Sequence, residues 1–248
     1  MSSFNSAKIL LIHTFIIILW ILLPLSLGLA QKRRVPPGGR LAVVIDERLA
    51  ALRSAPDLSG RLISRLSRGR LVAIRNASRS RDGLIFFQVA VTRRTLGWIQ
   101  AEALMAPWRA EDDDRSLRLM RTSEDFDRIA RGRLFLDAFP RSPLRPQALL
   151  LFAEAAEQAA DKLSREAERR LDQNEMAAGG APEFSYFLNY NGLDRYNRQA
   201  IRFTFDRSTK RFHYDGAAWR ELLRRYPRSP EAAEARKWLA APANVKQE

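Results

Sequence analysis

The sequence predicts an α+β multidomain fold, in which a small all-β barrel is followed by a domain of α-helical hairpins with a β-hairpin insert. Short apolar runs separated by polar turns fill residues 41–99, which is the pattern of a small barrel. The pentapeptide aromatic-Pro-Arg-Ser-Pro occurs twice, at residues 139–143 and 226–230, and each copy separates two amphipathic runs. Charge also divides the chain: residues 32–109 hold 16 Lys and Arg against 5 Asp and Glu, a net +11, whereas residues 110–248 hold 25 against 23.

Residues 1–30 are predicted to be a signal peptide or an N-terminal membrane anchor. Residues 9–30 form an apolar run that follows a single Lys and is long enough to span a bilayer as a helix. Gly28 and Ala30 are the small residues that a signal peptidase requires, and Pro24 interrupts the run. These features favour cleavage after Ala30.

A retained anchor is the alternative. Lys32-Arg33-Arg34 comes just after the apolar run, and an excess of Lys and Arg normally marks the cytoplasmic side of a membrane segment. Pro36-Pro37-Gly38-Gly39 carries no helix or strand signal, so residues 31–39 are predicted to be a linker.

Residues 40–106 are predicted to form the barrel. Two turns separate its strands, at Ser67-Arg68-Gly69 and Arg81-Asp82-Gly83, and both contain the Gly that tight turns favour. Short strands at this density favour a compact β-barrel over βαβ units. The five runs with the length and composition of strands are residues 41–45, 61–66, 71–74, 84–91 and 96–99.

The same segment carries several motifs in a fixed order. They are Leu52-Arg53-Ser54-Ala55-Pro56, Leu66-Ser67-Arg68-Gly69, Phe86-Phe87-Gln88-Val89 and Leu96-Gly97-Trp98-Ile99-Gln100. In order and spacing they resemble the arginine-serine, leucine-x-x-glycine, aromatic-x-x-valine and glycine-tryptophan landmarks of bacterial SH3-like (SH3b) domains, through nearly the whole segment. The resemblance implies a non-catalytic binding module, usually outside the cytoplasm, that holds peptidoglycan or a partner peptide.

Three residues of these motifs, Arg53, Phe87 and Trp98, are candidates for contact with a ligand. Trp98 follows the Gly of the last turn, where it lines a ligand groove or, alternatively, fills the barrel. Arg53 contacts a ligand or, alternatively, braces a turn or lies in solvent. The basic field of this part of the chain attracts polyanions such as wall polymers, acidic lipid headgroups or nucleic acid, or, alternatively, is only a solvated face.

Residues 107–114 are predicted to be a second linker, because Pro107 and the acidic run from Glu111 to Asp114 reverse the local charge. A helical-hairpin domain follows over residues 115–240, and residues 241–248 form a tail. Thr122 to Asp125 fits a capping box, and an apolar stripe then predicts a helix that ends at Phe139.

The two pentapeptides are predicted to be the elbows of helical hairpins. In each, the first Pro ends one helix, Ser caps the next and the second Pro occupies its first position. These elbows and the Ala-rich runs after them resemble tetratricopeptide-type hairpins of exported bacterial proteins. The resemblance implies a surface that holds a protein partner. The alternative is a purely structural layer, because the elbows lie 87 residues apart rather than one repeat apart.

Residues 179–216 are predicted to form an aromatic insert between the hairpins. Ile201, Phe203 and Phe205, then Phe212 and Tyr214, alternate with polar residues on either side of a turn, which predicts a β-hairpin. The other aromatic side chains form a sugar-stacking platform or, alternatively, pack onto the helices: Phe184, Tyr186, Phe187, Tyr190 and Tyr196.

Composition limits the chemistry. The chain has no Cys, and His213 is its only His after residue 30, which excludes disulfides, Cys-His catalysis and a two-His zinc peptidase motif. A glycosidase needs only two carboxylates, but no motif here singles out a pair. We therefore expect no enzymatic activity, no catalytic residue, no cofactor and no metal. We expect no nucleic-acid partner either, because export is predicted and no basic recognition motif is present.

Together these patterns predict an exported, non-enzymatic protein of the bacterial cell envelope, in the periplasm or on the extracytoplasmic face of the membrane. The barrel engages peptidoglycan or another anionic envelope polymer, and the helical hairpins engage a protein partner. Residues 9–30 anchor the chain if they are not removed. The alternatives are a pure protein-protein interaction scaffold, in which the barrel packs on the helices, and an accessory subunit of a cell-wall enzyme.

Overall fold

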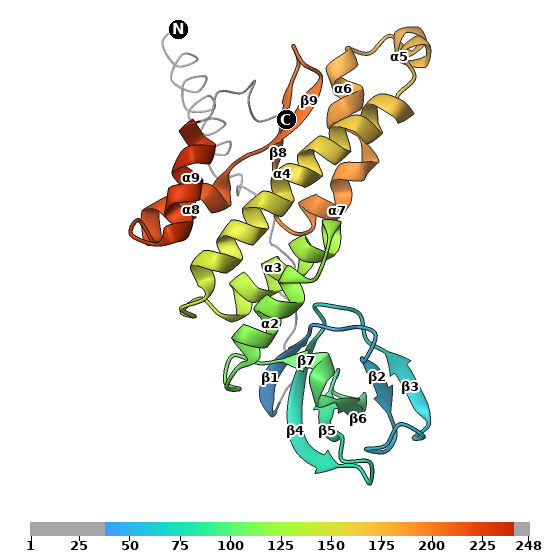
Figure 1. Ribbon diagram of the computed structural model, residues 1–248. Coiled ribbons are helices and arrows are strands. Elements are labelled where there is room, and N and C mark those ends of the chain that lie inside the picture. Colours follow the sequence, from blue (N-terminus) through green and yellow to red (C-terminus); the bar gives the residue numbers. More distant parts are fainter. Residues whose placement is uncertain (1–37, 241–248) are drawn as a thin grey trace, which may run out of the picture. The chain divides into compact units, whose positions relative to one another are not determined.

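The computed structural model describes residues 38–240, so the predicted signal or anchor segment, most of the linker 31–39 and the tail 241–248 lie outside the described residues. The first part of the described chain is one antiparallel sheet (Figure 1). Its strands lie in the order β3-β2-β6-β5-β4-β1-β7. Their bounds are β1 Arg40–Val44, β2 Ala51–Arg53, β3 Leu62–Arg65, β4 Leu71–Arg79, β5 Ile85–Ala90, β6 Leu96–Gln100 and β7 Leu104–Met105.

The sheet is not closed into a barrel, so the prediction of a barrel was wrong in this respect. The end strands β3 and β7 do not pair with each other. Strand β7 has only two residues, which pair with β1, and the chain then turns into a helix that contacts β7. The five predicted strands correspond to β1, β3, β4, β5 and β6. Strands β2 and β7 have three and two residues, too few to produce a recognisable apolar run.

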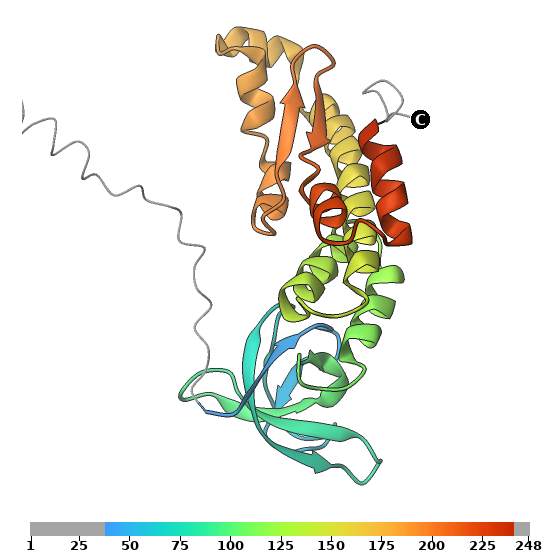
Figure 2. The same ribbon diagram turned by 90° about the vertical axis from the view of Figure 1, so that its left-hand side faces the viewer.

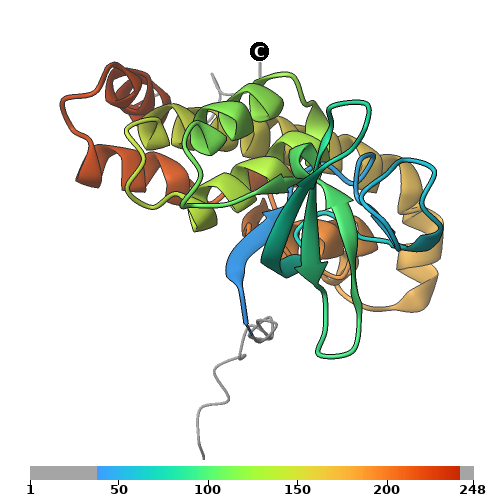
Figure 3. The same cartoon turned by 90° about the horizontal axis from the view of Figure 1, so that it is seen from below.

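The sheet has a hydrophobic core of its own. Seen from below (Figure 3), β4, β5 and β6 run side by side, as their pairing requires. Because side chains alternate between the two faces of a strand, one face of each strand supplies this core. Its buried residues include Ala42 and Val44 of β1, Leu52 of β2, Val72 and Ile74 of β4, Val89 of β5 and Ile99 of β6.

The helical part begins earlier than predicted. Helix α2, Asp112–Arg121, occupies residues that the sequence assigned partly to a linker, and its three Asp residues lie in the first turn, where they favour the helix dipole. Helix α3 is Asp125–Ala138, as the apolar stripe predicted. The predicted capping box was wrong: Thr122 lies at the end of α2, and its hydroxyl donates to the carbonyls of Arg118 and Leu119.

Two helical hairpins follow the predicted elbows. The first joins α3 to α4, Arg145–Arg170, and the second joins α8, Ala217–Arg225, to α9, Pro230–Ala240. The second elbow is capped as predicted, because the Ser229 hydroxyl accepts from the Ala232 N–H at 3.2 Å and Pro230 is the first helical residue.

The first elbow differs although its sequence is the same in four of five positions. Helix α4 begins at Arg145 rather than at Pro143, and its cap residue is Leu144. Another proline, Pro146, falls in the first turn, where its missing N–H is tolerated, and this shifts the start of the helix beyond Ser142. The Ser142 hydroxyl accepts from the Leu144 N–H at 3.1 Å, just before the helix, and donates to the Asp113 carboxylate at 2.7 Å, which joins the elbow to α2.

The two hairpins are joined by a buried arginine. Arg145 at the start of α4 is 7% exposed, and its Nη1 donates to the Leu136 carbonyl at 2.7 Å. Its Nη2 donates to Glu221 of α8 at 2.8 Å. A buried guanidinium needs such partners, so the first residue of α4 binds the second hairpin.

The insert packs onto α4. It contains α5 Gln173–Gly179, α6 Glu183–Leu188, a short 3-10 turn Asn191–Leu193, α7 Asp194–Asn197 and the hairpin of β8 Phe203–Asp206 and β9 Arg211–Tyr214. Figure 2 shows this hairpin alongside α4, and the Phe212 N–H donates to the buried Ser164 hydroxyl of α4 at 2.8 Å. The predicted β-hairpin is confirmed, with Phe203 opposite Tyr214 and Phe205 opposite Phe212.

Most aromatic rings of the insert are packing residues. Phe187, Tyr190 and Tyr196 are at most 6% exposed. Phe187 stacks on Phe205 with ring centroids 4.7 Å apart. Of the two interpretations of these rings, the geometry favours packing onto the helices over an exposed platform.

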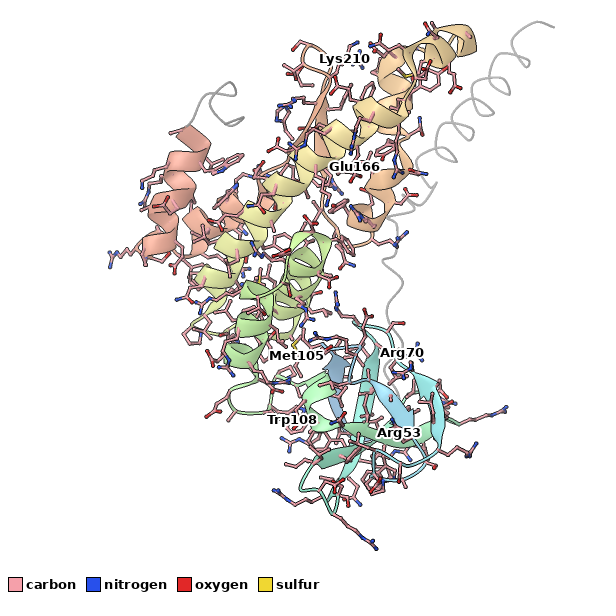
Figure 4. The ribbon with its side chains drawn as sticks, turned by 45° about the vertical axis from the view of Figure 1, so that its right-hand side comes forward. Arg53, Arg70, Met105, Trp108, Glu166 and Lys210 are labelled. Carbon is pink, nitrogen blue, oxygen red and sulfur yellow. The ribbon has the colours of Figure 1, made fainter. Side chains whose placement is uncertain are left out.

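A second hydrophobic core joins the helices to the sheet. Val43, Ile45 and Met105 from the sheet side belong to the same cluster of buried residues as Leu117 and Met120 of α2. Figure 4 shows Met105 where the sheet meets the helices. Within residues 38–240, no helix combines the length and the apolar character that crossing a bilayer requires.

Candidate ligand-binding face of the sheet

Two of the three predicted contact residues lie side by side. Arg53 on β2 is directly opposite Trp98 on β6, so both side chains project from the same face of the sheet. Gly97 makes this pairing close, because a Cβ at that position would lie 2.7 Å from Leu52 Cγ and 2.9 Å from the Arg53 carbonyl. Gln88 of β5 is the neighbour of Trp98 on its other side.

Arg53 also braces the loop that follows β2. Its Nη1 donates to the Gly60 carbonyl at 2.8 Å. Within that loop, the Ser59 hydroxyl and N–H both donate to Asp57 at 2.7 Å, and the hydroxyl bond is the larger cause that lowers the pKa of Asp57. The alternative in which Arg53 braces a turn therefore accounts for its hydrogen bond to Gly60. No other guanidinium nitrogen of Arg53 is hydrogen-bonded within the described residues.

Phe87 lies on the opposite face. It is paired with Ile99, a fully buried residue, and packs against the core of the sheet. The Arg109 guanidinium carbon lies 5.3 Å from the centroid of its ring. The structure therefore brings Arg53 and Trp98 together and separates Phe87 from them.

Exposed aliphatic residues extend the surface around Trp98, and the sequence reading did not single them out. Leu62 is opposite Arg53, and Leu96 is two residues from Trp98, so register places both on the same face. Their exposed fractions are 45% and 40%. We call this surface the Trp98 face; it consists of Arg53, Leu62, Gln88, Leu96 and Trp98. In the sequence, the available signal was the presence of leucines, Leu62 and Leu96, in predicted strands at positions that alternation places on the solvent face.

Arginines without ion pairs surround this face. Arg93 and Arg94 form the turn between β5 and β6, and Arg61 and Arg65 flank β3. All four are exposed, and none forms an ion pair within residues 38–240. Their positive charge is therefore offset only by solvent and mobile ions.

A second aromatic site was missed because it lies in the predicted linker. Trp108 is half-buried, and its Nε1 donates to the Leu41 carbonyl of β1 at 2.9 Å. The Arg40 guanidinium lies 3.7 Å from its ring centroid. Arg53 and Trp108 stand at separate places in Figure 4. The contacts of Trp108 fasten the segment after β7 to the sheet.

An ion pair between Arg68 and Asp127 lies at the edge of the contact between the sheet and α3. Arg68 donates to both carboxylate oxygens of Asp127 at 2.8 and 3.1 Å, and this bond is the main cause that lowers the pKa of Asp127. Arg131 of α3 is 5% exposed nearby, and burial lowers its pKa. Its Nε and Nη1 have no hydrogen-bond partner within the described part of the chain.

The insert holds a small pocket. It has a volume of about 340 Å³, and its lining includes Met176 and the Lys210–Glu183 ion pair at 2.7 Å. Both charges of this pair are already matched, so the pocket offers no unpaired charge to a ligand. Among residues 38–240, no group of three or more His, Asp or Glu side chains is arranged to hold a metal ion.

Comparisons of this chain with protein-family models, with curated proteins and with solved structures find no match.

Proposed function

We propose that this chain is a non-enzymatic binding protein of the bacterial cell envelope, and that its sheet binds an anionic envelope polymer such as peptidoglycan. The observation that carries the proposal is the Trp98 face, where Arg53 lies opposite Trp98 among exposed arginines that form no ion pair within residues 38–240. An aromatic ring stacks on sugars, and unpaired arginines attract carboxylates or phosphates.

The finer fold assignment is part of the same proposal. We take the sheet to be an SH3-like module and the two hairpins to be tetratricopeptide-like. The short antiparallel strands around one core and the glycine-tryptophan motif on β6 support the first. The Ser229 cap and the close packing of Ala153, Ala156 and Ala160 support the second.

The decisive experiment is cosedimentation of residues 31–248 with purified cell-wall sacculi over a series of salt concentrations. The double variant Arg93→Gln/Arg94→Gln is compared with a matched double variant in the second helical hairpin, Arg224→Gln/Arg228→Gln. Arg224 and Arg228 are also exposed. Each double variant removes two charges, but only the first removes them beside the Trp98 face.

We expect the parent chain to bind and its binding to weaken as salt screens the charges. The Arg93/Arg94 variant binds at least about tenfold more weakly, since a basic residue near an anionic surface contributes about 1 kcal/mol. The Arg224/Arg228 variant binds like the parent. Equal losses in the two variants, or no binding by the parent, would contradict the proposal.

A specific observation favours a second function, that of a pure interaction scaffold. The sheet and the helices share buried residues, and Arg68 binds Asp127 across their contact, as the scaffold alternative requires. In that case the sheet supports the helices, and a protein partner binds through apolar contacts that are nearly insensitive to salt. The same salt series separates the two functions.

A further inference from the structure

The sheet has one covered edge and one open edge. At the covered edge, Leu104 and Met105 of β7 are completely buried, and α2 contacts them. At the other edge, β3 pairs only with β2 among the described strands. Leu62 and Ile63 of β3 are 45% and 40% exposed, which is high for aliphatic residues of a strand.

The backbone of the open edge has unpaired groups. The Leu66 N–H donates to the Ala50 carbonyl at 2.9 Å, so at Leu66 the backbone faces β2. Because successive residues of an antiparallel strand face opposite edges, the N–H and C=O of Arg65 face away from β2. Ile63 is the extra residue of a bulge, since Leu62 and Ser64 pair with consecutive residues of β2. Ile63 therefore has no residue directly opposite it on β2.

The charges beside this edge select what pairs with it. Arg61 and Arg65 are exposed and form no ion pair within residues 38–240. A second copy of the chain, approaching edge to edge, would bring the same arginines against them, and like charges opposite each other destabilise paired strands. A strand with a carboxylate opposite Arg65 would form a favourable cross-strand pair instead.

We propose that the open edge of β3 binds an extended acidic peptide segment of a partner protein, which adds to the sheet as an antiparallel strand beside Ile63–Arg65. Backbone hydrogen bonds to Ile63 and Arg65 hold the segment, as in other cases of strand addition. Its acidic side chains face the two arginines, and its apolar side chains cover Leu62 and Ile63. This inference does not require polymer binding. It shares Leu62 and the neighbouring Arg61 and Arg65 with the surface around Trp98, but it is carried by the backbone groups of the outer edge.

The probe is a soluble ten-residue peptide of alternating Val and Glu with a terminal fluorophore, and its control is the same peptide with Gln in place of Glu. Binding to residues 31–248 is followed by fluorescence anisotropy. Amide hydrogen exchange, read by NMR, locates the bound peptide. We expect the Glu peptide to bind and to slow exchange at Ile63 and Arg65 but not at Trp98.

Two variants separate pairing from general attraction. Arg61→Glu with Arg65→Glu is expected to weaken binding of the Glu peptide at least about tenfold, since two attractive charges become repulsive. The matched change, Arg79→Glu with Arg81→Glu, reverses two exposed arginines beside the β4–β5 turn and is expected to leave binding within about threefold of the parent.

Ile63→Pro removes the N–H of the bulge residue, which has no residue opposite it on β2, and is expected to abolish protection at Arg65 while the far-ultraviolet circular dichroism is unchanged. The proposal is overturned if both double variants lose binding equally, if the peptide slows exchange at Gln88 and Trp98 rather than at Ile63 and Arg65, or if Ile63 becomes protected by self-association as the concentration of chain alone rises. Loss of sacculus binding alone would affect only the polymer proposal.

Discussion

Tyr214 joins the insert to the second helical hairpin. It ends β9 and is 7% exposed, and its hydroxyl accepts a hydrogen bond from the Ala218 N–H at 2.9 Å. Asp215 accepts from the Ala217 N–H at 2.9 Å. The first N–H groups of a helix lack partners within it, and here two residues before α8 supply them. Burial raises the pKa of Tyr214 well above the ordinary value for tyrosine.

This pKa shift predicts a loss of stability in alkali. Below about pH 10 the phenol is neutral in the folded and unfolded chains. Above that pH the unfolded chain releases the proton and the folded chain keeps it, so the free energy of unfolding falls by about 1.4 kcal/mol per pH unit. At pH 8, Tyr214→Phe is expected to lower the free energy of unfolding by about 1 kcal/mol, because it loses the hydrogen bond to the Ala218 N–H. It also removes the contribution of Tyr214 to the fall in stability above about pH 10.

Urea unfolding of the parent and of Tyr214→Phe at pH 8, 10 and 11 measures the difference. The gap in stability between the two chains is expected to close and then reverse as the pH rises. Burial also raises the pKa of Tyr196, which is unchanged in the variant and adds the same slope to both chains. Parallel curves for the two chains would show that Tyr214 ionises as freely when folded as when unfolded.

At the scale of elements, the two elbows show how much a short motif specifies. Ser229 caps α9, whereas the Ser142 hydroxyl accepts only from the Leu144 N–H ahead of α4 and donates its proton to Asp113. The same substitution, Ser→Asp, therefore has different effects at the two positions. Ser229→Asp keeps a good cap at the positive end of the helix and is expected to change stability by less than about 0.5 kcal/mol.

Ser142→Asp places a second carboxylate beside Asp113 and removes the donor, which is expected to cost about 1 to 2 kcal/mol. Thermal and urea unfolding of the two variants measures the contrast. Equal effects at both positions would mean that Ser142 acts as a helix cap after all. The variant Ser142→Ala, which loses the bond without adding charge, separates repulsion from the missing donor.

The sequence was sufficient for elements whose signal is local. The runs that became β1, β4, β5 and β6 and the β8–β9 hairpin are long enough to show their period, and their positions were predicted. Helix α2 was missed because its acidic first turn resembles a linker, although acidic residues favour that position. The start of α4 was misplaced because Pro146, three residues beyond the pentapeptide, decides it.

The candidate site was predictable only in part. The pairing of Arg53 with Trp98 depends on β2, a three-residue strand that is recognised only beside its neighbours. Phe87 and Phe86 are adjacent in the chain, and the sequence does not say which of them faces the core of the sheet. The role of Trp108 depends on a contact with Leu41, 67 residues earlier, for which the sequence carries no local signal.

At the scale of the whole molecule, the sheet and the helices are expected to unfold together. Val43, Ile45 and Met105 share a core cluster with the helices, and the described residues, 38–240, lie within one compact unit. Separating the two parts would expose these residues to water and break the Arg68–Asp127 pair. If separating the sheet from the helices costs more free energy than the difference in their own stabilities, the two parts unfold together in one step.

The tryptophans provide the test, because Trp98 and Trp108 report on the sheet and Trp219 and Trp238 report on the helices. In residues 31–248 carrying Trp219→Phe and Trp238→Phe, fluorescence follows the sheet alone while circular dichroism at 222 nm follows mainly the helices. We expect both signals to have one midpoint in urea. A separate midpoint for the sheet would show two independent domains.

Helix α2, which covers β7, also limits how the chain assembles. A strand that joins the sheet at β3 presents its own outer edge to solvent, but the sheet offers no further position at β7. Sheets of two copies cannot extend into a continuous array, because growth would need the open β3 edge of one copy to pair with the β7 edge of the next, and α2 covers β7. Complexes built through the sheet therefore stop at a fixed stoichiometry instead of extending into filaments.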